Sequence, residues 1–254
     1  MLEKRNFYIN GKWVKPKNQK DIEVINPATE KSCAIISSGG KEDINDAVIA
    51  AKQAFKTWGF STKEDRITLL ENFYALYKKR WNDITDAIIL EMGAPKDFAS
   101  KLQTGTGASH TKSFIKYLKE FEFEKTLGDH AKNQRILYEP KGVCALITPW
   151  NWPINQVCLK VIPALAAGCT MVLKPSELAP LSAIIIAELI DEAGFPKGVF
   201  NLVNGDGAIT GDALTSHPDV NMISFTGSTR AGALISQNAA KDFKRISLSL
   251  IHIS

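Results

Sequence analysis

A short run of aromatic and amide side chains, Pro149-Trp150-Asn151, follows an apolar segment that is predicted to be the strand 143–148. Proline lacks the N–H that a central strand must donate, so Pro149 ends this strand. Open α/β sheets bind ligands just past the carboxyl ends of their strands. An asparagine fixed there offers an amide donor that can stabilise a developing oxyanion. Taken alone, the run fits an ordinary polar loop equally well.

Three more predicted strands end in residues suited to binding a nucleotide. Lys174-Pro-Ser-Glu177 supplies an ammonium group for ribose hydroxyls or phosphate, and a carboxylate that can accept both hydroxyls of an adenosine ribose. Asn204-Gly-Asp-Gly207 lets the backbone approach a ligand, and Gly227-Ser228 opens a helix whose amides favour an anion. Each run alone fits an ordinary turn. Four such runs at one edge of a sheet favour a dinucleotide site.

The glycine spacing in the third of these runs differs from the usual dinucleotide fingerprint. Gly205-x-Gly207-x-x-x-Gly211 is one residue longer than that fingerprint, and the first strand of the sheet lacks it. We therefore expect a cofactor to bind outside the ordinary Rossmann pose, with its phosphates near Ser228.

A regular alternation of strands and helices must position these runs. The predicted strands are 143–148, 170–173, 199–203, 222–225 and 245–250, and the helices between them are 155–167, 181–193, 208–216 and 230–240. Continuous apolar strands alternating with helices indicate a parallel sheet covered on both faces. The expected fold class is α/β, with a doubly wound parallel-sheet nucleotide-binding domain preceded by a helical layer and a short β arm.

The first half of the chain supplies that β arm and helical layer. Asn10-Gly11 predicts a β-hairpin over 7–14, and a turn is expected at 26–29. Helices are expected over 43–58 and over 97–122, the latter with an interruption near residues 105 and 107. Between them, a capping box at Ser61 and Glu64 opens a second helix, and a third helix ends with Gly93 as its C-cap. A further strand is expected at 135–140.

Composition and charge exclude several classes of protein. The 254 residues are 44% hydrophobic and 23% charged, with a net charge of +4 and scattered lysines, so we expect no nucleic-acid partner and no membrane-binding patch. The N-terminus lacks the apolar core of a signal peptide, and the longest apolar run, 178–190, is too short to span a membrane. We therefore expect a cytoplasmic protein.

The four cysteines and four histidines show no metal-binding spacing, and no metal is predicted. Cys144 and Cys169 lie in apolar strands and Cys158 in an apolar helix, so each is expected to be a buried small hydrophobe. Because an apolar setting raises the pKa of a thiol, neither Cys144 nor Cys169 is expected to act as a nucleophile.

Six runs resemble the aldehyde dehydrogenase family in order and spacing along essentially the whole chain. They are Asn26-Pro-Ala-Thr29, Ile147-Thr-Pro-Trp-Asn-Trp-Pro153, Pro163-Ala-Leu-Ala-Ala-Gly168, Lys174-Pro-Ser-Glu177, Gly194-Phe-Pro-x-Gly-Val199 and Phe225-Thr-Gly-Ser-Thr229. The resemblance implies NAD(P)-dependent oxidation of an aldehyde to a carboxylic acid through a covalent thiohemiacetal. It also implies a homo-oligomer, a dimer or tetramer in the full-length form, with an oligomerisation strand within 120–140.

The resemblance assigns roles to individual residues. Asn151 resembles the family's oxyanion donor, and Lys174 with Glu177 resembles its ribose-binding pair. Through Glu177 we expect NAD to be favoured over NADP. The residues expected to hold the cofactor are Ile147, Thr148, Pro149, Trp150, Lys174, Ser176, Glu177, Gly207, Gly211, Phe225, Gly227, Ser228 and Ala231.

The chain departs from the family after Leu248. There the family continues with a glutamate general base and a Gly-Gly-Lys turn, and its nucleophilic cysteine lies further downstream, whereas this chain reads Ser249-Leu-Ile-His-Ile-Ser254. A truncation, a reading-frame error or an incomplete sequence would each produce such a tail. We expect a β arm and helical layer at 1–134, an NAD-binding region at 135–248 and a non-family tail at 249–254. Since the catalytic domain is missing, the chain as written is expected to be inactive.

Patterns typical of other functions are absent or misplaced in this sequence. Tyr74-x-x-x-Lys78 matches the pair of short-chain dehydrogenases, but it precedes every nucleotide-type strand, and Tyr74 falls on the apolar face of its helix. The chain has no Gly-x-x-x-x-Gly-Lys-Ser/Thr run, which argues against a kinase or NTPase. The alternative to the enzyme is a nucleotide-binding or interaction protein without turnover.

Overall fold

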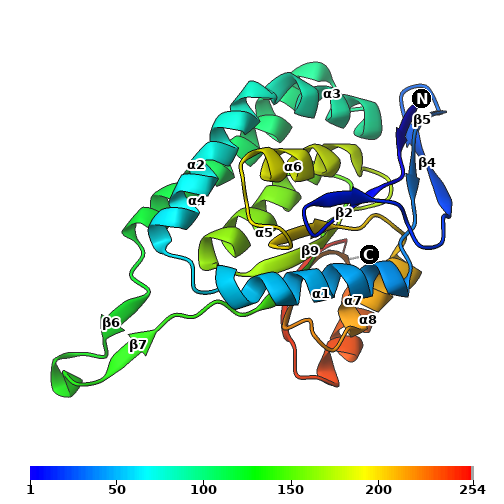
Figure 1. Cartoon of the computed structure of the whole chain (residues 1–254). Coiled ribbons are helices and arrows are strands. Elements are labelled where there is room, and N and C mark those ends of the chain that lie inside the picture. Colours follow the sequence, from blue (N-terminus) through cyan, green and yellow to red (C-terminus); the bar gives the residue numbers. More distant parts are fainter. Residues whose placement is uncertain (253–254) are drawn as a thin grey trace.

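A computed structural model describes the backbone of residues 1–252 and the side chains of residues 1–250. Within this part of the chain, the centre of the molecule is a seven-stranded sheet (Figure 1). Its strands, in spatial order, are β12 (Arg245–His252), β11 (Met222–Ser228), β8 (Val143–Ile147), β9 (Thr170–Lys174), β10 (Phe200–Leu202), β2 (Phe7–Ile9) and β3 (Lys12–Val14). The strands from β12 to β10 are parallel, and β2 and β3 add an antiparallel edge. The predicted parallel sheet is confirmed.

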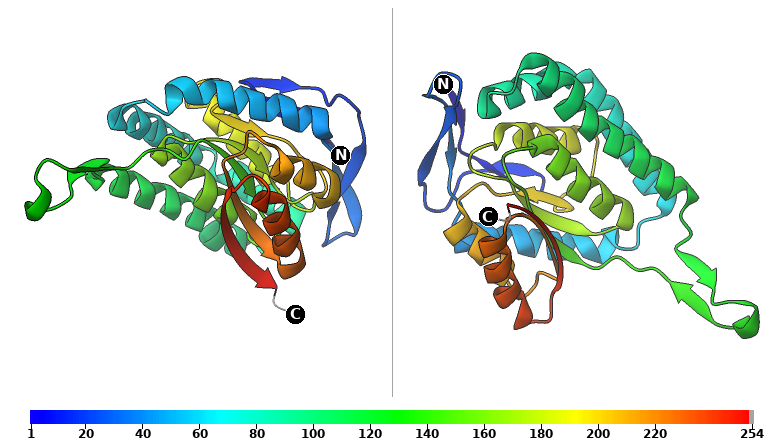
Figure 2. Two further views of the ribbon diagram at one scale, coloured as in Figure 1. Left: turned by 90° about the horizontal axis from the view of Figure 1, so that it is seen from below. Right: turned by 180° about the vertical axis from the view of Figure 1, so that it is seen from behind.

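Helices lie on both sides of this sheet (Figure 2). One side carries α2 (Lys63–Lys79), α3 (Trp81–Met92), α4 (Gly105–Glu120), α5 (Pro153–Ala167) and α6 (Leu181–Glu192), and the other carries α1 (Lys41–Trp58), α7 (Asp212–Ser216) and α8 (Thr229–Ala240). The sheet has a hydrophobic core on each side. In β8, Cys144 and Leu146 point into the core under α2 to α6, whereas Val143, Ala145 and Ile147 point into the core under α1, α7 and α8. Both faces of the strand are buried, so its sequence is apolar throughout. The doubly wound fold is confirmed.

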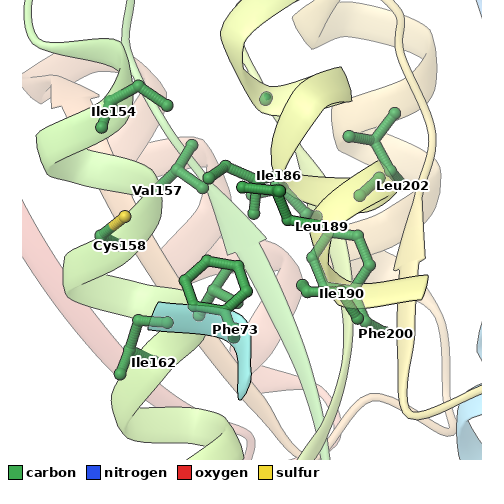
Figure 3. Close-up of a cluster of buried hydrophobic side chains, with 14 of the residues drawn as sticks. Phe73, Ile154, Val157, Cys158, Ile162, Ile186, Leu189, Ile190, Phe200 and Leu202 are labelled. Atoms are coloured by element: carbon green, nitrogen blue, oxygen red, sulfur yellow. The ribbon is translucent and has the colours of Figure 1, made fainter. Parts of the chain in front are cut away.

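The larger core joins side chains from both halves of the chain (Figure 3). Phe73 of α2, Ile162 of α5, Leu189 of α6 and Phe200 of β10 are all buried there. Burying an apolar side chain of this size stabilises the fold by about 1.5–3 kcal/mol. The helical layer and the sheet therefore stabilise each other.

The N-terminal hairpin forms one edge of the central sheet. Asn10 and Gly11 have φ angles of 52° and 72°, the left-handed values that a two-residue hairpin turn requires. Tyr8 of β2 pairs with Leu202 of β10 in antiparallel register. The hairpin predicted from Asn10-Gly11 is confirmed, and the structure adds its place beside β10.

Two smaller sheets lie outside the central one. β1 (Leu2–Lys4), β5 (Lys31–Ser37) and β4 (Asp21–Asn26) form a three-stranded sheet in that order, of which the sequence indicated only the turn after Asn26. β6 (Glu124–Thr126) and β7 (Arg135–Leu137) form a two-stranded arm that projects from the body, with η2 (Asp129–Ala131) between them (Figures 1 and 2). The strand predicted at 135–140 is therefore shorter and lies outside the central sheet.

Helix α2 begins one residue later than the predicted capping box. Its N-cap is Thr62, whose Oγ1 accepts a hydrogen bond from Asp65 N at 3.1 Å, while the Asp65 carboxylate accepts from Thr62 N at 3.4 Å. Ser61 Oγ instead accepts from Arg66 Nε at 2.8 Å. The predicted pair of Ser61 with Glu64 is wrong because Thr62 with Asp65 offers the same two bonds one position further on.

The fourth predicted helix changes type where an interruption was expected. It starts as a π-helix, η1 (Phe98–Thr104), and continues as α4 from Gly105. A second π-helix, η3 (Gly207–Gly211), precedes α7. Segments of π-helix are rare and frequently occur at functional sites.

Candidate functional site

The carboxyl ends of β8, β9 and β11 border a cavity of about 620 Å³. Six of the residues predicted to hold a cofactor line it, namely Ile147, Lys174, Gly207, Gly211, Phe225 and Ala231. They come from separate strand ends, which meet because parallel strands finish at the same edge of a sheet. The volume falls within the range of small-molecule and cofactor sites.

The cavity also has lining residues that were not predicted. They are Ala208, Asp212, Thr215, Leu234, Ile235 and Asn238, whereas two further lining residues, Asp206 and Arg230, belong to the runs at 204–207 and 227–232 that the sequence already indicated. Residues 230, 231, 234, 235 and 238 share one face of α8 at helical spacing. That periodicity was visible in the sequence, but it does not say whether the face meets a core or a ligand.

Lys174 ends β9 and is the most deeply buried cation of the cavity. It is 3% exposed, and its Nζ donates to Glu177 Oε2 and to Pro175 O, each at 3.1 Å. Burial lowers the pKa of Lys174, and the Glu177 carboxylate opposes that shift. The pair presents a donor and an acceptor side by side, which is what a vicinal diol requires.

Asp206 and Gly207 shape the wall of the cavity beyond β10. Asp206 is the N-cap of η3, and its Oδ1 accepts a hydrogen bond from Ile209 N at 2.7 Å. A Cβ added at Gly207 would meet no protein atom within 4 Å. The glycine therefore keeps open a space that no protein group uses, as expected where a ligand approaches the backbone.

Ser228 begins helix α8. Its Oγ accepts a hydrogen bond from Ala231 N at 3.3 Å, so the hydroxyl acts as the N-cap. A Cβ at Gly227 would lie 2.5 Å from Phe225 Cζ, so the Phe225 ring packs directly on this glycine. The predicted helix start with its anion-favouring end is present next to the cavity.

Asn151 lies between β8 and α5, next to Trp152, the N-cap of α5. The side-chain Oδ1 of Asn151 is buried without a hydrogen-bond partner among the described residues, and its backbone O accepts from Gln103 Nε2 at 3.2 Å. Buried polar atoms are nearly always paired, so an unpaired amide suggests a group held for a ligand. Gln103 belongs to the π-helix η1, and its own Oε1 is also buried and unpaired.

The remaining predicted cofactor residues do not line the cavity. Thr148 is buried and its N donates to Lys174 O at 3.3 Å, which extends the pairing of β8 with β9. Pro149 is half-buried, and Trp150 is 46% exposed. Ser176 Oγ accepts from Leu178 N at 3.3 Å and shapes the turn that carries Glu177.

The cysteines differ from expectation at one position. Cys144, Cys158 and Cys169 are buried, as predicted, and Cys33 is half-buried. Cys144 Sγ donates a weak hydrogen bond to Gly142 O at 3.9 Å. The pKa of Cys144 is raised by Cys169 and by burial, whereas that of Cys169 is lowered by the neighbouring Cys144 and by the backbone N–H groups of Lys141 and Gly142. The expectation of a raised pKa at Cys169 is therefore wrong, because polar groups surround a thiol that lies in an apolar sequence.

Two features of the described residues bear on other functions. In that part of the chain, no group of three or more histidine, cysteine, aspartate or glutamate side chains is arranged to hold a metal ion. None of the helices described is long and apolar enough to cross a membrane.

The fold is that of a Rossmann-like α/β protein with a cavity at the carboxyl edge of its parallel sheet. The sequence model of the aldehyde dehydrogenase family matches residues 13–250, and the chain belongs to this family.

Relatives and solved structures agree with that assignment. A 3-succinoylsemialdehyde-pyridine dehydrogenase of a Pseudomonas species is 51% identical over 98% of this chain and 52% of its own length. The crystal structure of an aldehyde dehydrogenase from Bartonella henselae matches with a TM-score of 0.97 at 54% identity, over 98% of this chain and 52% of that one. Aldehyde dehydrogenase C of Pseudomonas syringae, solved with NAD+ and octanal, matches with a TM-score of 0.94 at 46% identity, over 97% and 50%. The chain spans about half the length of the relatives that it matches.

Proposed function

We propose that this chain carries the cofactor-binding half of an NAD-dependent aldehyde dehydrogenase, which oxidises an aldehyde to a carboxylic acid. The main support is the ion pair of Lys174 with Glu177: Lys174 is buried and lines a cavity of about 620 Å³ whose wall at Gly207 is left open, and Glu177 is a half-buried partner outside the lining. The Pseudomonas syringae relative was solved with NAD+ and an aldehyde, octanal, which supports the same cofactor and substrate class for this chain.

Residues that line the cavity and residues beside it would divide the binding of the cofactor between them. The Lys174 ammonium group would donate to ribose hydroxyls and the Glu177 carboxylate would accept from them, because the two groups lie 3.1 Å apart. Phosphate would lie at the start of α8, where Ser228 caps the helix and backbone amides favour an anion. Four residues beside the cavity would also contribute to binding the cofactor, namely Thr148, Pro149, Trp150 and Ser176. NAD, when bound, would supply the hydride acceptor.

Asn151 would serve the aldehyde rather than the cofactor. Its side-chain amide would donate to the aldehyde oxygen as negative charge develops there, and its fixed position would avoid reorganisation during the reaction. Asn151 Oδ1 is buried without a hydrogen-bond partner among the described residues, so the fold leaves that end of the amide unengaged.

Cofactor preference tests this proposal. Glu177 should favour NAD over NADP about ten-fold or more, because it bonds the ribose hydroxyls and repels a 2′-phosphate. Titration of the 254-residue chain with each dinucleotide, followed by tryptophan fluorescence, measures the two affinities. Glu177→Gln should narrow the difference between the affinities for NAD and NADP. Glu23 is an exposed carboxylate on β4, so Glu23→Gln should leave that difference unchanged. Failure of both dinucleotides to bind, or equal affinities in the wild type, would contradict the proposal.

A nucleotide-binding role without turnover is the second candidate. Cys144, Cys158 and Cys169 are buried at 3%, 0% and 5% exposure, and none of the described cysteines lines the cavity. This chain alone would then bind NAD and leave catalysis to a family-type second half.

We also propose that the full-length form is a homo-oligomer in the cytoplasm. The support is the arm of β6 and β7, which projects from the body and exposes Leu127 and Leu137 at 44% and 60% (Figure 1). An exposed two-stranded edge of this kind can pair with a second copy.

A further inference from the structure

We propose that Asp212 and Asn238 make the cavity of about 620 Å³ selective for a 6-aminopurine, so that a bound dinucleotide is recognised at the amino group of its adenine. Asp212 is the first residue of α7, Asn238 lies near the end of α8, and both line this cavity. The inference rests on the proposed binding of NAD, and it adds how the base of that cofactor is recognised.

Two hydrogen bonds join α7 and α8 at this end of the cavity. Asn238 Nδ2 donates to Asp212 Oδ1 at 2.8 Å and to Thr215 Oγ1 at 3.2 Å. The two helices lie next to each other in Figure 1, and residues of both line the cavity. The position of the Asn238 side chain is therefore set by the opposite helix.

The chemistry of its two partners fixes which way the Asn238 amide faces. An ionised carboxylate can only accept, and Thr215 Oγ1 donates its own hydrogen to Asp212 O at 3.3 Å. Both partners of Asn238 are therefore acceptors, so the NH₂ group must face them. The amide oxygen, Oδ1, takes no part in these bonds and stays available to a ligand.

The groups left over at this end of the cavity are acceptors. Among the described residues, neither Asn238 Oδ1 nor Asp212 Oδ2 has a hydrogen-bond partner, because the bonds of these two side chains use Nδ2 and Oδ1. Asp212 is exposed and Asn238 is half-buried, so a ligand can reach both. Arg230 also lines the cavity, but it lies eight residues before Asn238 on α8, which is ~12 Å along a helix.

The wall beside these acceptors is apolar. Ala208 of η3 and Leu234 and Ile235 of α8 line the same cavity. Leu234 precedes Asn238 by about one helical turn, so their side chains are neighbours, and it is 57% exposed although it is large and apolar. A flat base in the cavity would cover this side chain, and removing apolar surface from water favours binding by ~25 cal/mol per Å². An apolar ring with a polar edge therefore suits this region.

The acceptors lie next to the proposed ribose site. A Cβ added at Gly211 would lie 4.0 Å from Lys174 Cδ, so the lysine side chain runs beside the residue that directly precedes Asp212. Lys174 and Glu177 are the proposed ribose-binding pair. A base attached to that ribose is therefore brought toward α7, where Asp212 and Asn238 lie.

Two free acceptors discriminate between purines by the group at C6. Adenine carries an amino group there, which donates, whereas an oxygen at C6, as in hypoxanthine, accepts. The amino group would donate to Asn238 Oδ1 or Asp212 Oδ2, and the oxygen would be repelled by both. Water weakens this effect because Asp212 is exposed and Asn238 is only half-buried, so we expect a preference of about five-fold rather than the ~10⁴ of fully buried sites.

Calorimetric titration of the 254-residue chain tests the inference. The two probes are NAD and nicotinamide hypoxanthine dinucleotide, which carries an oxygen in place of the amino group at C6 of the purine. We expect NAD to bind more tightly by about five-fold. Equal affinities, or tighter binding of the hypoxanthine form, would overturn this inference and leave the proposed function standing. If neither dinucleotide binds, the proposed function and this inference both fail.

Variants test the two acceptors separately. Asp212→Asn should narrow the preference for NAD, because its amide can still accept from Asn238 but presents a donor in place of the free Oδ2. Asn238→Ala should also narrow the preference, because it removes Oδ1. The matched changes Asp86→Asn and Asn82→Ala, at exposed positions of α3, should leave the preference unchanged.

Circular dichroism and urea unfolding establish whether each variant is folded. If Asn238→Ala does not fold, Asp212→Asn and the comparison of the two dinucleotides in the wild type decide. A folded Asp212→Asn that keeps the full preference for NAD would overturn the inference.

Discussion

At the scale of single residues, Gly207 and Gly205 show how neighbouring glycines serve different purposes. A Cβ at Gly207 would enter open space at the cavity wall, whereas one at Gly205 would overlap Thr210, and Gly205 has a φ of 153°. The first glycine keeps room for a ligand, and the second is required by the fold itself.

Alanine at each position should therefore separate binding from stability. Gly207→Ala should leave the free energy of unfolding within about 0.5 kcal/mol of wild type and weaken NAD binding several-fold. Gly205→Ala should lower the unfolding free energy by about 1–3 kcal/mol, because the alanine is strained as well as crowded. Urea unfolding and NAD titration measure both effects. A Gly207→Ala variant that binds NAD as well as wild type would argue against a cofactor at this wall.

At the scale of elements, Glu91 joins the end of α3 to the start of α6. Its carboxylate accepts hydrogen bonds from Leu181 N, from Ser182 N at 3.2 Å and from Ser182 Oγ at 2.5 Å, so it caps the amino end of α6 from another helix. Burial raises its pKa from 4.5 to about 7, and these hydrogen bonds oppose that shift. The cap is therefore sensitive to pH.

The raised pKa of Glu91 predicts a stability that falls as the pH rises. Between pH 4.5 and about 7 the folded protein keeps the Glu91 proton that the unfolded chain loses, so the free energy of unfolding decreases by up to about 3 kcal/mol. Urea unfolding across this interval measures the slope. Glu91→Gln should remove this pH dependence of the free energy of unfolding, whereas Glu192→Gln at the exposed end of α6 should retain it. Identical slopes in wild type and Glu91→Gln would show that Glu91 does not titrate in this way.

The strand β12 forms an open edge of the central sheet. It pairs with β11 on one side only, and Leu248 and Leu250 are 40% and 37% exposed. Unpaired N–H and C=O groups beside exposed apolar side chains are a template for pairing with another chain.

The isolated 254-residue chain should consequently be prone to aggregate. Size-exclusion chromatography and binding of the dye ANS test this expectation. Ser249→Lys, which places a charge on the edge, should reduce aggregation, whereas Ser216→Lys, the same change on exposed α7, should not. Monodisperse wild-type protein that does not bind ANS would contradict the prediction.

At the scale of the whole molecule, the cavity and the cysteines occupy different places. Cys144 and Cys169 lie at the amino edge of the sheet, Cys158 is buried in α5, and Cys33 belongs to the small sheet, whereas Asn151 lies at the carboxyl edge. The family's route needs a thiolate nucleophile beside the oxyanion donor, because without a covalent intermediate the donor has no charge to stabilise.

The 254-residue chain should therefore form no NADH from aldehydes, although it should bind NAD. Absorbance of NADH during incubation with short-chain and aromatic aldehydes measures turnover, with a full-length family member as the positive control. In a form that carries a family-type second half, Asn151→Ala should lower kcat by ~10²–10³. NADH production by the 254-residue chain that persists after all its cysteines are replaced by serine would refute this prediction.

The sequence by itself determined the hairpin over 7–14, the alternation of strands and helices from residue 143 onward, and the residues at the ends of those strands. Apolar periodicity, Pro149 and the Asn10-Gly11 turn act over a few residues, so the sequence displays them directly. Because parallel strands finish at one edge, Ile147, Lys174 and Phe225 could be assigned to one site before any contact was known.

Only the tertiary structure decided the contacts between segments far apart in the chain. Arg66 lies against Gly168, and Glu91 caps the helix that begins at Leu181, although about a hundred residues separate each pair. Such partners have no local signal, since packing and burial choose them. For the same reason Cys169 looked like an inert apolar thiol in sequence, whereas the fold surrounds it with N–H groups and a guanidinium. A residue's type and its neighbours along the chain specify its element, but its ionisation depends on the charges that folding brings beside it.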